Sequence, residues 1–175
     1  ENGRYINLPE SLRVIRQYGG VCLKNNSASD RENAASTEKK VSAGLREMSM
    51  ELPVPGILES PFGVFESKIF SYKKQKIEEK KYTKWFDYDK IKDSPCVRTR
   101  RQGDYLTVNS EGGKKKLNRI FIDEKIPAEM RDRIPVVAAG SEILWIPGGR
   151  MNEKYKITST TGRVLELHYQ GGALA

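Results

Sequence analysis

The segment from Cys96 to Arg133 constrains the possible folds of this chain of 175 residues most. It combines a dense positive charge with turn residues that separate short strands and helices. Between Cys96 and Arg119 seven basic residues stand against two acidic ones, a local net charge of +5 in a chain with a formal net charge of +8. The seven are Arg98, Arg100, Arg101, Lys114, Lys115, Lys116 and Arg119. Such an excess indicates a polyanionic partner, either a nucleic acid or an anionic membrane surface.

The same segment predicts its own local structure. Alternation predicts a strand at Val97–Arg101 with Arg98 and Arg100 on one face, and a turn at 102–104 leads into a second strand at Tyr105–Val108. Apolar residues at positions i, i+3 and i+4 predict a helix at Lys115–Asp123. Pro127 suits the first turn of a second short helix at Ala128–Arg133. The segment is therefore expected to present Arg and Lys from two strands and a helix.

Before this segment, β-branched and aromatic residues separated by turns predict strands. We expect an N-terminal hairpin in which RVIRQ and GVCLK pair across residues 18–20. Residues 25–44 are polar and small and predict a flexible linker, with a short solvated helix as the alternative. The charged run at 73–81 is interpreted as a solvated loop. The strands expected are 5–8, 12–17, 21–24, 48–52, 57–58, 64–70 and 82–89.

After the basic segment the chain returns to strands. They are expected at 136–138 and 143–146, followed by a closing hairpin of 155–159 with 164–169. The predicted core residues are Leu117, Phe121, Ile134, Val136, Leu144, Trp145, Ile157 and Leu165. The expected fold class is α+β, with small mixed or antiparallel sheets and two short helices, preceded by a β-hairpin and a flexible linker. We predict a β-rich segment at 1–92, a nucleic-acid-binding domain at 93–169 and a loose tail at 170–175.

The sequence contains few residues suited to catalysis. The Gly113-Lys114 pair lacks the Walker spacing, and no GxGxxG follows a strand. One histidine, His168, and two distant cysteines, Cys22 and Cys96, predict no metal site. A nucleophilic pair of Cys96 with His168 is the weakest alternative considered. The cysteines are expected to be reduced thiols in a cytosolic protein, with one disulfide as the alternative.

A membrane partner is not favoured. The longest apolar runs fall far short of the roughly 20 residues that a spanning helix needs. The basic run at 73–84 lacks the apolar stripe of an interfacial helix. Arginine forks and lysine point charges suit phosphate groups instead, although a charged run is often only a solvated face. Composition alone leaves RNA and DNA binding open.

At this segment the sequence resembles a known family. The motifs are RTRRQGD at 98–104, GGKKKL at 112–117, FIDEKIP at 121–127, MRDRIPVV at 130–137 and EILWIPG at 142–148. Their order and spacing, from about residue 96 to 169, closely resemble the C-terminal domain of bacterial tRNA(Ile)-lysidine synthetase. Residues 8–23 and 52–56 resemble the middle part of that enzyme more weakly.

The resemblance implies a concrete role. The family converts the wobble cytidine, position 34, of an isoleucine tRNA with a CAU anticodon to lysidine, using ATP and free lysine. That chemistry belongs to an N-terminal PP-loop domain whose SGGxDS motif this sequence does not contain. The resemblance therefore implies a cytoplasmic tRNA-binding part with no cofactor, metal or catalytic residue of its own, which is non-catalytic alone. It implies the PP-loop domain and tRNA as partners and leaves a homodimer open.

The resemblance also gives roles to individual residues. Asp104 is expected to orient an arginine or cap the turn, and Arg131 and Arg133 have ion pairs with Asp132 or Glu129 as their structural alternative. A stand-alone RNA-binding module and, last, a small hydrolase using Cys96 are the alternative functions. The residues implied to bind RNA are Arg98, Arg100, Arg101, Lys114, Lys115, Lys116, Arg119, Arg131, Arg133 and Arg150.

Overall fold

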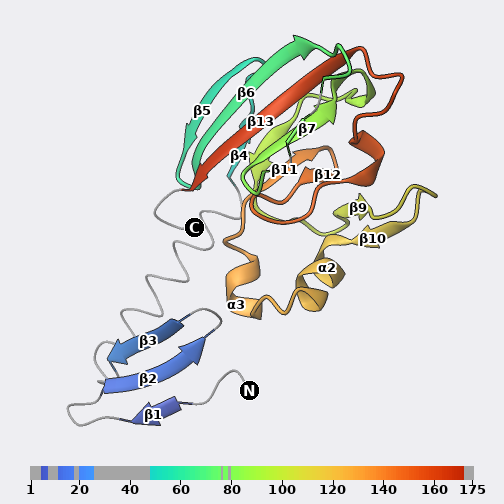
Figure 1. Cartoon of the computed structure of the whole chain (residues 1–175). Coiled ribbons are helices and arrows are strands. Elements are labelled where there is room, and N and C mark those ends of the chain that lie inside the picture. The colour runs from blue at the N-terminus through green and yellow to red at the C-terminus, as the bar shows by residue number, and fades with distance from the viewer. Residues whose placement is uncertain are drawn as a thin grey trace. The chain divides into compact units, whose positions relative to one another are not determined.

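The computed structural model describes the backbone of residues 5–7, 12–17 and 20–25, and residues 48–75, 77–78 and 80–171 in full (Figure 1). The chain divides into two compact units, residues 1–43 and 44–175, which are described separately below. The predicted linker at 25–44 lies outside the described residues, apart from Asn25 at the end of a strand.

The N-terminal unit contains a three-stranded antiparallel sheet in the order β1-β2-β3. Its strands are β1 (Tyr5–Asn7), β2 (Leu12–Gln17) and β3 (Gly20–Asn25). β2 and β3 pair antiparallel, with Arg13 opposite Lys24 and Gln17 opposite Gly20. The predicted hairpin is confirmed, and β1 extends it through its pairing with β2.

The second unit is built on two sheets. The six-stranded sheet has the order β10-β9-β12-β11-β8-β4 and is mixed, because β12 runs parallel to β9. Its strands are β4 (Ser49–Glu51), β8 (Cys96–Arg98), β9 (Tyr105–Thr107), β10 (Lys114–Lys116), β11 (Val136–Ala139) and β12 (Glu142–Trp145). The four-stranded sheet is antiparallel, in the order β5-β6-β13-β7. Its strands are β5 (Gly56–Ser60), β6 (Gly63–Ser71), β7 (Thr83–Asp87) and β13 (Arg163–Gly171).

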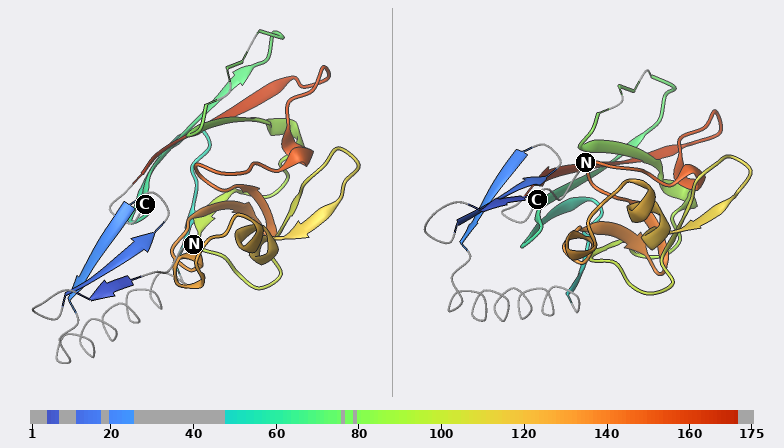
Figure 2. Two further views of the ribbon diagram at one scale, coloured as in Figure 1. Left: turned by 60° about the horizontal axis from the view of Figure 1, so that its bottom comes forward. Right: turned by 90° about the horizontal axis from the view of Figure 1, so that it is seen from below.

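Two short α-helices follow β10. They are α2 (Leu117–Asp123) and α3 (Ala128–Arg131), and single 3₁₀ turns occur at η1 (Tyr88–Lys90) and η2 (Glu153–Tyr155). Figures 1 and 2 show the four-stranded sheet on one side of β11 and β12 and the helices on the other. The α+β fold class with mixed and antiparallel sheets and two short helices is confirmed.

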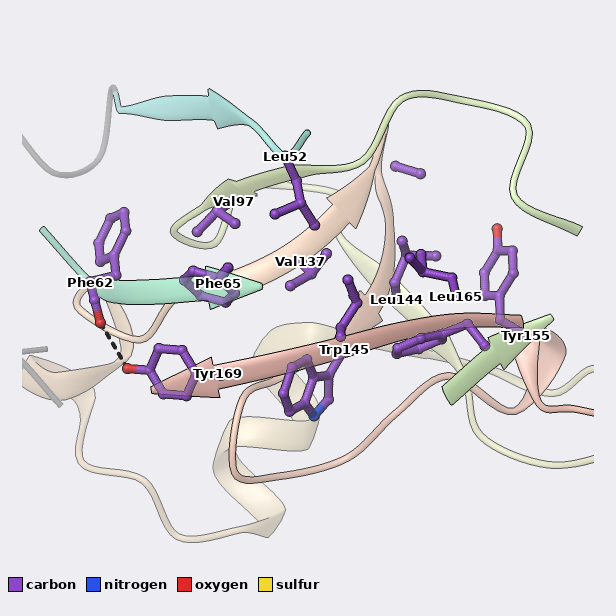
Figure 3. Packing of buried hydrophobic residues seen from close by; sticks show 13 residues of the cluster. Leu52, Phe62, Phe65, Val97, Val137, Leu144, Trp145, Tyr155, Leu165 and Tyr169 are labelled. Atoms are coloured by element: carbon purple, nitrogen blue, oxygen red, sulfur yellow. Dashed lines mark hydrogen bonds between the residues drawn. The ribbon is translucent and has the colours of Figure 1, made fainter. Parts of the chain in front are cut away.

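β11 and β12 form the middle layer of the second unit, because all of their residues are buried and both faces of the strands are covered. Val137 and Leu144 face the four-stranded sheet, where they pack with Phe65, Leu165 and other residues of the larger core cluster (Figure 3). Their neighbours Val136, Ala138 and Ile143 face α2 and pack with Leu117, Ile120 and Phe121. Strands buried on both faces carry continuous apolar runs, as VVAA does here. Of the predicted core residues, Ile134 and Ile157 are partly exposed and the others are buried.

Three predictions about elements are wrong. Lys114–Lys116 form a strand paired with Tyr105–Thr107, and the helix starts only at Leu117. Residues 155–159 are not a strand, since Tyr155 ends η2 and β13 pairs with β6 and β7 instead. β8 ends at Arg98, so Arg98 and Arg100 do not share a strand face.

The structure also does not divide at residue 92. β13, which lies after that point, takes its neighbours β6 and β7 from before it, and β4 pairs with β8 across it. The apolar residues Val164, Leu165 and Leu167 of β13 are fully buried by these partners. Residues from both predicted segments therefore share one core, and β13 continues to Gly171, into the predicted tail.

Candidate nucleic-acid interface

The junction of β10 and α2 carries three exposed cations, Lys114, Lys116 and Arg119. β10 is the edge strand of the six-stranded sheet, and its side chains alternate between exposed Lys114 and Lys116 and half-buried Lys115. α2 buries Leu117, Ile120 and Phe121, which leaves Asn118, Arg119, Ile122 and Asp123 exposed on its other face. Lys114 pairs with Thr107 at the loop end of the β9–β10 hairpin.

Asp123 forms ion pairs with two cations of this junction. Its carboxylate accepts a bond from Lys115 Nζ at 2.5 Å and pairs with Arg119 Nε at 3.2 Å. The hydrogen bond from Lys115 lowers the pKa of Asp123 most, and the charges of Lys115, Arg119 and Arg150 lower it further. Arg150, distant in sequence, is therefore brought into the electrostatic field of the same carboxylate.

Arg100 makes a second group of contacts close to this junction. Its Nε donates to Asp132 Oδ1 at 2.7 Å, and its Nη1 lies 3.4 Å from Asn118 Oδ1. The guanidinium thus connects the loop after β8 with the end of α3 and the start of α2, and its side chain remains 31% exposed. Arg101 is exposed beside it, and its backbone N–H donates to Asp104 Oδ2 at 2.7 Å. Together with the Asp123 group, these residues form what we call the basic surface: Arg100, Arg101, Lys114, Lys115, Lys116, Arg119 and Arg150.

Arg98 does not belong to the basic surface. Its side chain is 1% exposed and makes a bidentate pair with Asp104, at 2.7 and 2.8 Å. It also donates to the carbonyl oxygens of Thr99 and Gly140. Burial works against its charge, but the hydrogen bonds and charge of Asp104 outweigh this and raise the pKa of Arg98. The expectation that Arg98 contacts RNA is therefore corrected to a structural role, whereas the expectation that Asp104 orients an arginine is confirmed.

Arg131 and Arg133 lie at the end of α3, beside the basic surface. Arg131 Nε donates to the carbonyl of Ile126 at 2.9 Å, which differs from the expected ion-pair alternative. Asp132, between them in sequence, pairs with Arg100. Arg133 is half-buried and lines a groove described below.

The prediction from sequence missed Tyr105 as a member of this region. Lys114 Nζ lies 4.7 Å from the centroid of the Tyr105 ring, a cation–π contact. Tyr105 pairs with Lys116 in the β9–β10 register, which places it on the same side of the sheet as the two exposed lysines. The sequence offered no signal for this pairing, because the strand at Lys114–Lys116 is visible only in the structure.

The described part of the chain shows no arrangement typical of catalysis. No group of three or more His, Cys, Asp or Glu residues in it is placed to hold a metal ion. His168 Nδ1 is 2.9 Å from Thr83 Oγ1 in the four-stranded sheet, whereas Cys96 is a free thiol in the six-stranded sheet. None of the helices in the described residues is long and apolar enough to span a membrane.

The fold and surface thus define the described unit as a β-rich α+β domain with a cationic face. Residues 96–167 match the family described as "TilS substrate C-terminal domain". A solved structure titled "Crystal structure of TILS C-terminal domain" aligns with a TM-score of 0.60 and 33% identity, covering 71% of this chain and 96% of that one.

Full-length relatives agree with this assignment. The tRNA(Ile)-lysidine synthases of Caldanaerobacter subterraneus and Geobacillus kaustophilus are both 35% identical, over 94% and 97% of this chain and 32% and 34% of their own lengths. That of Clostridium tetani is 32% identical, over 97% of this chain and 34% of its length. The chain belongs to the tRNA(Ile)-lysidine synthase family and corresponds to its C-terminal portion. It spans about a third of the length of these relatives.

Proposed function

We propose that this chain binds tRNA through the basic surface and holds it for modification by the catalytic part of a lysidine-forming enzyme. The observation that carries the proposal is the gathering of β10, α2 and the loop after β8 into one cationic face. Five of its cations, Arg101, Lys114, Lys116, Arg119 and Arg150, are exposed. Phosphate contacts supply most of the affinity of RNA-binding surfaces of this kind.

The names of the relatives support the finer parts of the proposal. Relatives of about three times this length are tRNA(Ile)-lysidine synthases, which points to an isoleucine tRNA as the partner. We propose that a PP-loop domain of the same protein uses ATP and lysine to modify cytidine 34, in the cytoplasm. This chain then supplies affinity and orientation rather than chemistry. A homodimer would be detected by analytical ultracentrifugation, and the proposal does not require one.

The experiment that tests the proposal is a salt titration of tRNA binding. Lys114→Ala and Lys116→Ala should each weaken binding several-fold and reduce the slope of log K against log salt by about 0.9, the value for one phosphate contact on a duplex. Lys115→Ala should have a smaller effect, because Asp123 already neutralises Lys115. Lys68→Ala is the matched control, since Lys68 is exposed on β6 and pairs with Glu66 outside the basic surface.

Unchanged slopes in both variants would overturn the proposed surface. The stand-alone RNA-binding module is separated from the enzyme by two observations. One is whether the reading frame upstream of Glu1 encodes a PP-loop domain. The other is whether this chain, given tRNA, ATP and lysine, forms lysidine; we expect no product.

A further inference from the structure

An apolar groove lies next to the basic surface in the second unit. It has a volume of about 330 Å³ and is formed where the end of β12, the start of β7 and the connection from α2 to α3 meet. Apolar wall residues include Ile126, Pro135, Ile146 and Pro147. Its volume is at the lower end of the range for small-molecule pockets, about 300–1,000 Å³. We call this feature the Tyr82 groove.

Tyr82 is the aromatic wall of the groove. Only four large hydrophobic side chains among the described residues are exposed, and two of them, Tyr82 at 45% and Met130 at 42%, line this groove. The tyrosine is held in place: its carbonyl accepts a bond from Tyr169 N–H at 2.8 Å, and the two rings lie 6.2 Å apart. An aromatic ring that is fixed and still exposed is suited to stacking with a planar ligand.

Gly148 leaves the room that this ring needs. Its φ of +75° is in the left-handed region that favours glycine, and a Cβ at this position would lie 2.9 Å from Tyr82 Cε1. The ring therefore sits directly against the backbone of the loop after β12. Any larger residue at position 148 would displace the ring.

The charges around the groove favour an anionic occupant. Lys81 and Arg133 are at its rim with one carboxylate, Glu124. Lys81 Nζ is 5.2 Å from the centroid of the Tyr82 ring. Arg133 directly follows Asp132, whose carboxylate holds Arg100 of the basic surface at 2.7 Å. The groove and the basic surface are thus linked through the adjacent residues Asp132 and Arg133 after α3.

We propose that the Tyr82 groove takes an unpaired nucleotide of the RNA bound on the basic surface, with its base stacked on Tyr82 and its phosphate at Lys81 or Arg133. This inference rests on the proposed function. Stacking on aromatic side chains beside a basic track is how proteins hold single-stranded nucleotides with little dependence on sequence. An apolar peptide could pack against the same apolar walls, but it would make no ion pair with Lys81 or Arg133 at the rim.

The test compares two RNA probes on the full chain. Both share one stem-loop, and one of them carries a four-nucleotide unpaired 3′ extension whereas the other ends blunt. We expect the wild-type chain to bind the extended probe about tenfold more tightly than the blunt one. Tyr82→Ala should remove this preference and leave binding of the blunt probe unchanged, and Tyr82→Phe should keep the preference because the ring remains.

Each outcome decides between the two proposals. Binding of the blunt probe also shows that the Tyr82→Ala variant is folded, since the basic surface depends on the same unit. If wild type binds both probes equally, or if Tyr82→Ala keeps the preference, the groove does not hold a nucleotide, and the proposed RNA function stands. If wild type binds neither probe, the proposed function fails and this inference fails with it.

Discussion

At the scale of single residues, two arginines separated by one position have opposite roles. Arg98 is buried against Asp104, whereas Arg100 is partly exposed and held by Asp132. Removing one partner of a buried ion pair costs more than the pair contributes, because the remaining charge is left without compensation. Asp104 therefore matters to this fold chiefly because Arg98 is present.

We predict that Asp104→Ala lowers the free energy of unfolding by roughly 3–5 kcal/mol in urea denaturation, since it leaves the Arg98 guanidinium buried and unpaired. Arg101→Ala, at an exposed position in the same turn, should change it by no more than about 0.5 kcal/mol. The double variant Arg98→Met, Asp104→Leu should be more stable than Asp104→Ala alone. A loss below about 1 kcal/mol for Asp104→Ala would contradict the structural role assigned to the pair.

Glu142 is a second buried charge with an organised set of partners. Its Oε2 accepts bonds from Lys154 Nζ at 2.7 Å and from the Tyr155 hydroxyl at 2.9 Å. Burial opposes its charge, but the bonds from Lys154 and Tyr155 prevail and lower the pKa of Glu142 below its ordinary value of 4.5. The carboxylate is thus favoured in the folded state, and its stabilising effect is complete above pH 4.5 and lost as the pH falls through the folded-state pKa.

We accordingly predict a pH-dependent effect of Glu142→Gln. Above pH 5 the variant should unfold at lower urea, with a loss of roughly 1–3 kcal/mol from the weakened network. Below pH 4.5 the difference from wild type should shrink, because protonation also neutralises the wild-type carboxyl group. Glu59→Gln, at an exposed position on β5, should show no such pH dependence. A difference that is constant from pH 7 to pH 3 would show that the charge is not responsible.

At the scale of elements, α2 partly neutralises the positive charge of the β10–α2 junction. Asp123 is the one carboxylate on the exposed face of the helix, and it pairs with both Lys115 and Arg119. It also stands at the C-terminal end of α2, where a negative charge is unfavourable to the helix dipole. The helix therefore gains little intrinsic stability from this residue.

We predict that Asp123→Asn binds tRNA several-fold more tightly at low salt than wild type does. The change removes a repulsive charge and frees Lys115 and Arg119, so the log–log salt slope should steepen by about 0.9 for each added phosphate contact. Asp93→Asn changes the net charge equally in an exposed loop elsewhere and should leave the slope unchanged. Weaker binding by Asp123→Asn would show that Asp123 positions its two partners for RNA rather than masking them.

The elements also show what sequence patterns can and cannot predict. Patterns predicted most strands and both helices, because these patterns reflect local burial. Examples are the helical spacing of Leu117, Ile120 and Phe121 and the apolar run at 136–138. They failed for Lys114–Lys116, whose strand depends on backbone pairing with Tyr105–Thr107. They predicted the strand β13 but not its partners, which lie up to about a hundred residues earlier. They placed the basic residues on a common segment but could not show that Arg98 is buried, since Asp104, Thr99 and Gly140 enclose it only in the folded chain.

At the scale of the molecule, β13 makes residues 44–175 one structural unit. Residues 56–87 supply three of the four strands of its sheet. The remaining strand is β13, which comes much later in the sequence. The larger core cluster combines Phe65 and Phe86 from the first part with Leu144, Trp145 and Leu165 from the second. The matched family segment, residues 96–167, therefore depends on strands outside itself for its core.

We predict that a fragment of residues 44–175 folds, whereas a fragment of residues 93–175 does not. The shorter fragment lacks β4 to β7 and would expose the core faces of β11, β12 and β13 to water. Trp145, which is 0% exposed, reports this directly. With Trp85→Phe in the longer fragment, both fragments contain only Trp145. We expect blue-shifted emission and one cooperative urea transition for 44–175, and red-shifted emission with no transition for 93–175. A cooperative transition in the shorter fragment would show that the helix-side cluster around Phe121 is a sufficient core. The basic surface would then be a domain independent of the four-stranded sheet.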